Sequence, residues 1–430
     1  MYCRRKFLRY LQNAVGAGMV APYLLNNKAF ANVTSSKKIL QIFLLGGWDT
    51  GLATDPIVGS KASSSTYATA YQNYKVEAVE GKGNLLLGEG LIPAKNAFSR
   101  VPTCFINGMH IEVTAHELAQ NYVYSGVNSL SRSREFPAMV ARIGHESLAF
   151  PSFVAIGEPV PLGITRDKPP LHTQSPDQLN DMLNPFAESE LPAGTIGIAN
   201  ATLANINDIY SRQQNAKMIN YLRTWENSQL RLNELYDRNY QLKMDAEILA
   251  RYSVDNPWEQ GARIPAAYLV LKSGLSPFVT CSINGFDTHD NHFSKHIPLM
   301  QGFSQRLQTL IADMESTQDP DDTSKSLLES TSIIILSEFA RTPTLNAAAG
   351  TDHWQSGSAI LMGQDFKDNL VIGKTDDEAQ PMGWDGQAVA RTDETKILPE
   401  HLARAIVGHY SPDADLSELG EKSLDEIFSK

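Results

Sequence analysis

Four short segments of the sequence carry acidic residues, most of them beside histidine or arginine. They are GGWDT (46–50), GFDTH (285–289), SEFAR (337–341) and TDHW (351–354). The first three follow mainly apolar runs, at 39–45, 277–283 and 332–336, which are typical of buried parallel strands. In open α/β sheets, ligands bind at the carboxyl ends of the strands. Acidic side chains that meet there repel one another unless cations hold them, so the pattern predicts a metal site.

The candidate metal ligands are the carboxylates and imidazoles near these strand ends. They are Asp49, Asp287, His289, His292, Glu338, Asp352 and His353. Carboxylates are hard ligands and imidazoles are borderline ones, so the set predicts divalent metal and leaves zinc, calcium, magnesium and manganese open. Three alternatives remain. Asp49 could cap the following helix, the loop at 287–292 could carry solvated histidines, and Arg341 could pair with Glu338 in place of a metal.

The rest of the chain indicates the elements that position these segments. Apolar runs at 101–106, 152–156, 359–363 and 370–373 predict further strands, and the patterns at 115–126, 304–314 and 400–409 predict helices. Residues 202–252 carry long helical periodicity, interpreted as packing helices. Thr114 and Glu117 predict a capping box at the start of the helix at 115–126. The alternation predicts a mostly parallel sheet with helices on both faces, in one domain over residues 38–430.

Residues 1–31 have the pattern of a twin-arginine export signal. Arg4 and Arg5 are paired, a weakly apolar stretch follows at 12–25, and residues 29–31 (AFA) match a small–x–small cleavage pattern. An amphipathic N-terminal helix is the alternative. The signal predicts a periplasmic or otherwise exported protein that meets the twin-arginine machinery. No run of about 18 uncharged apolar residues occurs, so no transmembrane segment is expected after processing.

Composition and cysteine usage argue against two kinds of site. The 430-residue chain has a net charge of −11, and loss of residues 1–31 would remove only positive charges. Nucleic-acid backbones are bound by Lys and Arg, so nucleic acid is not an expected partner. Cys104 and Cys281 belong to no CxxC pair, which argues against a thiolate zinc site. An exported protein could join them in a disulfide, but two buried, reduced cysteines are the favoured interpretation.

Five motifs, in order along the chain, resemble a known family. GGWDT, AHELAQNYVYSG (115–126), GFDTH, SEFARTPTLN (337–346) and GTDHW (350–354) look like the exported family called domain of unknown function 1501, within the alkaline phosphatase/sulfatase-like superfamily. The resemblance implies a three-layer α/β/α sandwich with a mostly parallel central sheet. It also implies one or two divalent metals at the strand ends and a nucleophile at a helix N-terminus.

Carried over by motif, the resemblance assigns roles to individual residues. Asp49 resembles the first-strand metal ligand, and Asp287 with His289 or His292 resembles the Asp/His pair. Asp352 and His353 resemble the distal histidine segment. Glu338 stands where relatives carry the Asp of an Asp-His pair, and Phe339 replaces that histidine, which implies that one metal site is weakened.

The expected nucleophile position holds His116, which is neither Ser, Thr nor Cys. Thr114 is the nearest hydroxyl, and a capping role without catalysis is its alternative. The catalytic candidates are therefore Thr114 as nucleophile, His116 as base or extra ligand, and Arg341 as a clamp on an anionic oxygen. These residues predict an exported metal-dependent hydrolase that cleaves a small anionic phosphate or sulfate ester. The alternative is a non-catalytic binding or structural protein of the cell envelope that keeps the hydrolase fold.

Overall fold

The computed structural model describes residues 37–128, 154–157, 171–175, 177–178, 242, 244–384, 389–390, 396–412 and 414–429. The predicted export signal and most of the helical segment at 202–252 lie outside these residues. The end of that segment contains α9 (Ala246–Arg251). No helix among the described residues is both long and apolar enough to cross a membrane.

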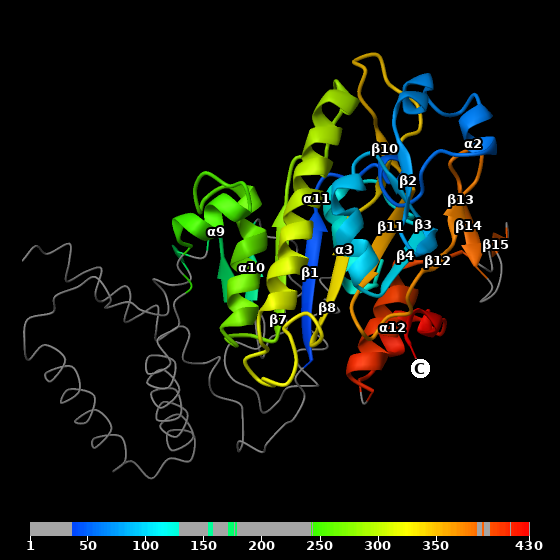
Figure 1. Cartoon of the computed structure of the whole chain (residues 1–430). Helices are drawn as coiled ribbons and strands as arrows, with labels where there is room; N and C mark the ends of the chain where they lie inside the picture. The colour runs from blue at the N-terminus through cyan, green and yellow to red at the C-terminus, as the bar shows by residue number, and fades with distance from the viewer. Residues whose placement is uncertain are drawn as a thin grey trace, which may run out of the picture.

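An eight-stranded sheet forms the centre of the molecule (Figure 1). Its order is β12 (Leu370–Ile372), β4 (Thr103–His110), β11 (Ser356–Met362), β8 (Thr331–Leu336), β1 (Lys38–Leu44), β7 (Phe278–Ile283), β5 (Val154–Ile156) and β6 (Leu171–Thr173). β11 runs antiparallel to both of its neighbours, whereas the other pairings in this sheet are parallel. The prediction of a mostly parallel α/β sheet is confirmed.

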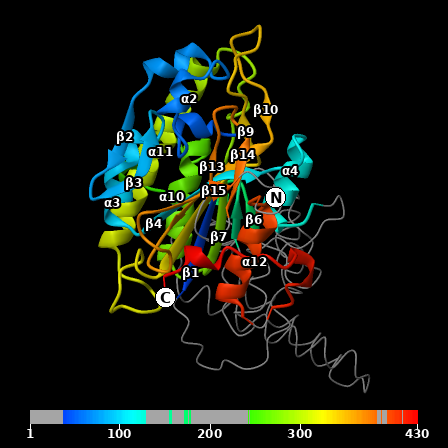
Figure 2. The ribbon, with the colours of Figure 1, turned by 90° about the vertical axis from the view of Figure 1, so that its right-hand side faces the viewer.

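Alternate residues of the strands face two separate apolar cores. On β1, Leu40 and Ile42 belong to the core that includes α10 (Arg263–Lys272) and α11 (His292–Ser316), while Ile39 and Phe43 belong to the core on the other face. The second core includes α4 (His116–Ser125) and α12 (Pro399–Tyr410). Figure 2 shows α10 and α11 on one side of the sheet and α4 and α12 on the other. The strands are therefore buried on both faces, which explains their apolar sequences.

Residues 50–100 form several short elements, some of which pack against α11. They are η2 (Thr50–Leu52), α2 (Ser60–Ser63), η3 (Thr69–Asn73), the hairpin β2 (Val76–Val79) and β3 (Lys82–Gly88), η4 (Ile92–Ala94) and α3 (Lys95–Arg100). Buried side chains attach this region to the sheet. The Thr54 hydroxyl donates to the Asn107 side chain over 2.7 Å.

The remaining short elements lie mostly towards the C-terminus. They are η5 (Gln260–Ala262), β9 (Ala340–Arg341), β10 (His353–Trp354), β13 (Lys374–Thr375), β14 (Pro381–Trp384), β15 (Val389–Ala390), η7 (Ser417–Leu419) and η8 (Asp425–Ile427). β9 and β10 pair antiparallel, so they join the segment after β8 to the segment before β11.

Two details of the sequence prediction change. The capping box is wrong, because α4 begins at His116 after Ala115, and no side chain caps it. Gly126 does end α4 in the left-handed conformation, with φ +71°. The predicted helix at 304–314 is longer than expected, since α11 starts at His292 and accommodates Pro298 inside it. Cys104 and Cys281 are free and buried, as the favoured interpretation predicted.

Candidate metal centre

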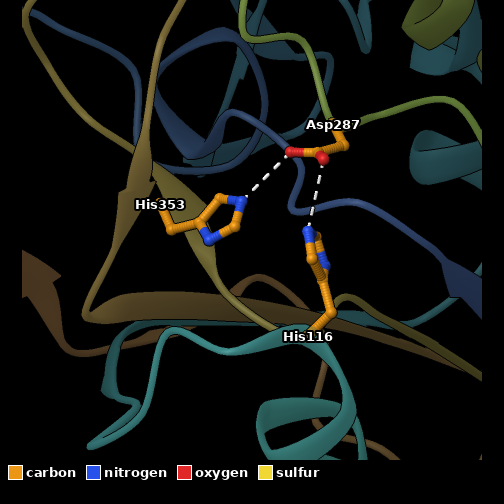
Figure 3. Close-up of side chains that lie close together, drawn as sticks. All are labelled: His116, Asp287 and His353. Atoms are coloured by element: carbon orange, nitrogen blue, oxygen red, sulfur yellow. Dashed lines mark hydrogen bonds and ion pairs between the residues drawn. The ribbon is translucent and has the colours of Figure 1, made fainter.

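Segments from distant parts of the chain meet at one edge of the sheet. Asp287 follows β7, Glu338 follows β8, His116 lies beyond β4, and His353 stands just before the antiparallel strand β11. Ligand atoms of His116, Asp287 and His353 all lie within 4.8 Å of one another. Figure 3 shows both imidazoles directed at the Asp287 carboxylate. The predicted convergence of acidic and histidine segments is therefore present for these residues.

The Asp287 carboxylate is the centre of the cluster. Its Oδ2 lies 3.3 Å from His116 Nε2. Its Oδ1 lies 3.0 Å from His289 Nε2 and 3.1 Å from His353 Nε2. The two Nε2 atoms of His289 and His353 are themselves 3.1 Å apart. Three imidazoles thus surround one partly exposed carboxylate.

Each of these imidazoles has its Nδ1 atom next to an acceptor. His116 Nδ1 lies 2.8 Å from Glu338 Oε1, His289 Nδ1 lies 3.0 Å from Asp352 Oδ1, and His353 Nδ1 lies 2.7 Å from the Thr114 carbonyl oxygen. Carboxylate and carbonyl oxygens only accept, so Nδ1 can donate a hydrogen bond to each of these oxygens. When Nδ1 carries the single proton of a neutral imidazole, the lone pair on Nε2 is directed into the cluster.

This donor set fits a metal ion. Lone pairs of imidazoles and an ionised carboxylate repel one another at about 3 Å unless extra protons or a cation lie between them. Histidine ligands in metalloproteins characteristically donate their other ring N–H to a carboxylate or a carbonyl, as these three do. An imidazole-rich set with one carboxylate favours zinc or another transition ion over calcium and magnesium, which prefer oxygen.

Glu338, which was predicted as a metal ligand, contacts the cluster through His116. Its fully buried carboxylate accepts from the Gly46 amide over 2.8 Å, from Gln120 Nε2 over 3.2 Å and from His116. The hydrogen bond to Glu338 is the main reason that the pKa of His116 is raised. The structure therefore places Glu338 behind an imidazole, where it orients His116.

Arg341 was predicted to clamp a substrate oxygen, with pairing to Glu338 as the alternative, and in the structure its hydrogen-bond partners are Asp287, Gly46 and Thr351. The buried guanidinium donates from Nη1 to Asp287 Oδ1 over 2.8 Å and to the Gly46 carbonyl over 3.0 Å. Its Nε donates to Thr351 Oγ1, and its Nη2 donates to the Thr351 carbonyl. These contacts use four of the five N–H donors of the guanidinium. Although burial raises the pKa of Asp287, the hydrogen bond from Arg341 helps to hold it below its usual value.

Asp49 and His292 lie apart from this cluster as a buried pair, contrary to the prediction that they join the other ligands. His292 Nε2 lies 2.8 Å from Asp49 Oδ2, which also accepts from the Tyr71 hydroxyl over 2.6 Å. Asp49 Oδ1 accepts from the amides of Gly51 and Leu52, so it caps η2 as the alternative interpretation proposed. Burial raises the pKa of Asp49, yet its contacts with His292, His296 and Tyr71 together outweigh burial and lower it.

His296 was not predicted, although it follows His292 by one helical turn on α11. Its Nε2 accepts from the Asp49 amide over 2.9 Å, so this nitrogen carries no proton. Burial lowers the pKa of His296 to about 3, which keeps the ring neutral. The spacing of four residues between two histidines was the signal available in the sequence.

Backbone packing determines how close the loops approach. Gly46 has φ +116°, and a Cβ there would lie 2.2 Å from the Asp287 amide nitrogen. A Cβ on Gly350 would lie 1.9 Å from the His289 carbonyl carbon. Glycine is therefore required at both positions for the loops to meet.

Phe339 forms an apolar wall beside the imidazoles. Its buried ring lies 4.4 Å from the His353 ring and 5.0 Å from the His116 ring, measured between centroids. The packing restricts the orientation of both imidazoles. Phe339 therefore offers no ligand atom and gives the two imidazoles a hydrophobic support.

Thr114 enters the site through its backbone. Its carbonyl accepts from His353, and among the described residues its hydroxyl makes no hydrogen bond to the cluster. Asp352 is exposed and contacts His289, with its carboxylate also accepting from Asn346 Nδ2 over 3.2 Å. The structure thus places Asp352 behind an imidazole, like Glu338.

The fold and site define an α/β protein with a histidine–aspartate cluster at the carboxyl edge of a mostly parallel sheet. The family model described as "Protein of unknown function (DUF1501)" matches residues 94–386, more than half of the chain. The chain belongs to this family. A search of the curated proteins found no match.

Proposed function

We propose that this protein is an exported metal-dependent hydrolase of phosphate or sulfate esters, built on the alkaline phosphatase/sulfatase-like plan. One observation carries the proposal. The Nε2 atoms of His116, His289 and His353 surround the Asp287 carboxylate at a solvent-accessible edge of the sheet. The order of the motifs and the position of the cluster at strand ends support the superfamily. The paired arginines Arg4 and Arg5 support export to the periplasm through the twin-arginine machinery.

His116, Asp287 and His353 would hold the metal, because one ligand atom from each lies within 4.8 Å of the other two. Zinc suits this set best, and one ion is proposed because Phe339 and the Asp49–His292 pair provide no second set in the described residues. A divalent ion supplies Lewis-acid chemistry, polarising an ester oxygen and lowering the pKa of water.

His289 is the proposed proton acceptor. It is the most exposed of the three imidazoles, and its Nδ1 lies against the Asp352 carboxylate, so Nε2 is the atom that would take a proton from attacking water. A base oriented by a carboxylate is a recurrent arrangement in hydrolases. The N-terminal amides of α4 begin at His116 and would favour an anionic group beside the cluster.

Water is the proposed attacking group. Ala115 precedes the first residue of α4, and within the described part of the chain the Thr114 hydroxyl makes no hydrogen bond to the cluster. The same observation favours the second candidate function, a non-catalytic envelope protein that binds the metal without turnover. A substrate assay separates the two.

The test measures metal content and hydrolysis by the purified exported protein. We expect about one zinc per chain and turnover of p-nitrophenyl phosphate, bis(p-nitrophenyl) phosphate or p-nitrophenyl sulfate. His353→Ala should lose the metal, whereas His289→Gln should keep the metal and lose turnover, and Thr114→Val should retain both. Chelator should lower the melting temperature of the parent but not of His353→Ala.

The matched control is His409→Gln, since His409 stacks on Phe428 away from the cluster. It should keep both metal and turnover. A parent that contains no metal and melts identically with chelator would refute the metal centre. Bound metal without turnover on all three esters would instead select the binding-protein function.

A further inference from the structure

We infer that the buried Asp49–His292 pair positions the candidate metal centre through Thr351 and Arg341. The pair is thus a positioning device, and neither member touches the metal. The inference rests on the metal proposed for that centre. It follows from a continuous chain of hydrogen bonds between the two groups of residues.

The chain of hydrogen bonds starts at the Asp49 carboxylate, both oxygens of which already have hydrogen-bond partners. Asp49 Oδ2 lies 2.8 Å from His292 Nε2 and 2.6 Å from the Tyr71 hydroxyl, and Oδ1 accepts two backbone amides. Asp49 and His292 are both buried. A carboxylate with this many donors has no oxygen facing an open position. It serves to hold the His292 ring in one orientation.

The His292 ring in turn contacts the hydroxyl of Thr351. Its Nε2–H donates to Asp49 Oδ2, and its Nδ1 faces two hydroxyl groups. Thr351 Oγ1 lies 3.0 Å from this Nδ1, and Thr288 Oγ1 lies 2.7 Å from it. Thr351 Oγ1 also accepts from Arg341 Nε over 3.1 Å, so this hydroxyl joins the imidazole to the guanidinium. The hydrogen bonds are therefore continuous from Asp49 to Arg341.

Arg341 completes the connection to the centre. The guanidinium donates hydrogen bonds to both the hydroxyl and the carbonyl of Thr351, which fix its orientation. Its Nη1 donates to Asp287 Oδ1 over 2.8 Å. Thr351 also directly precedes Asp352 and His353 in the chain. A displacement of Thr351 would therefore move the central carboxylate and one imidazole together.

Burial makes this chain sensitive to single atoms. Arg341, Thr351, His292 and Asp49 are all buried, so a lost hydrogen bond is not replaced by bulk water. Outer partners of metal ligands typically change metal affinity about 10–100-fold when removed. Thr351 is the most informative position, because its hydroxyl joins the two halves and it contacts no proposed ligand atom.

The experiment compares the zinc dissociation constant of Thr351→Val with that of Thr351→Ser, measured by competition with a chromogenic chelator on the metal-free full chain. We expect about tenfold or greater weakening for Thr351→Val. Thr351→Ser keeps the hydroxyl and should stay within about twofold of the parent. Thr103→Val is the matched control, since Thr103 is equally buried and its hydroxyl donates to the Val101 carbonyl at the start of β4. It should bind zinc like the parent.

Each outcome decides a separate question. Equal zinc affinity of parent and folded Thr351→Val overturns the inference and leaves the metal centre standing. Equal loss in Thr351→Ser and Thr351→Val also overturns it, because the methyl packing would then be responsible. A parent that binds no zinc overturns the proposed function and this inference together. If circular dichroism shows that Thr351→Val is unfolded, Thr351→Ala removes the same hydroxyl without added bulk and is held to the same expectation.

Discussion

Replacing Glu338 by glutamine tests whether a buried carboxylate tunes the proposed metal centre. The glutamine amide has nearly the same shape, and its oxygen can still accept from the Gly46 amide and from His116 Nδ1. The charge is lost, so a charge-assisted hydrogen bond to the imidazole becomes a neutral one of roughly half the strength. Removing such an outer partner weakens metal binding about 10–100-fold, and the conservative shape places the expected effect near tenfold, about 1.4 kcal/mol.

The assay is a zinc competition titration at pH 8.5, where protons compete little with the metal for imidazole. Asp55→Asn is the matched control. Asp55 is also a buried carboxylate, paired with Lys61 over 2.7 Å and with Thr375, but it takes no part in the cluster. The control should lose stability and keep its zinc affinity. Equal zinc affinities for parent and Glu338→Gln, or equal losses in both variants, would refute the argument that Glu338 acts through His116.

Three further predictions concern export, loop packing and acid stability. Arg4→Lys combined with Arg5→Lys should leave precursor in the cytoplasm, and an unchanged periplasmic yield would contradict the signal. Gly46→Ala should lower the free energy of unfolding by about 1–3 kcal/mol from its backbone conformation alone, with the 2.2 Å clash adding to this in urea unfolding. Burial lowers the pKa of His401 to about 4, below its unfolded value of about 6.5. Its contribution to stability is therefore present above about pH 6.5 and is lost as pH falls towards 4. His401→Asn should flatten the decline of unfolding free energy over that range, and an unchanged slope would count against it.

The sequence predicts the strand ends well because burial on both faces leaves a clear apolar signal. The runs that became β1, β7 and β8 were all located, and Asp287, His289 and His353 were correctly expected to converge. Periodicity contains no information on strand direction, however. The antiparallel direction of β11 therefore could not be predicted. Because β11 is reversed, His353, which precedes this strand, lies at the same edge of the sheet as the residues that follow β7 and β8.

The error at Asp49 has a local origin. The predicted helix at 304–314 begins about three turns later than α11, which starts at His292 after Asn291 in the left-handed conformation. With the true start, His292 and His296 lie one turn apart on a buried face, turned towards Asp49. Similarly, whether Glu338 meets a metal or an imidazole depends on the turn at Gly46, which is a tertiary contact. Residue types at strand ends therefore indicate which segments converge. Which side chain contacts which within the site is determined by tertiary packing.

The central place of β1 has a consequence for synthesis. This strand leaves the ribosome first among the described strands, yet its two neighbours end at Ile283 and Leu336. At ordinary translation rates, roughly 10–60 s pass before either edge of β1 can be paired. During that time a nearly continuous apolar strand has both edges open, which is a hazard for association with other chains. A holding chaperone that covers residues 38–45 during translation would therefore raise the yield of folded protein more than one acting on any later strand.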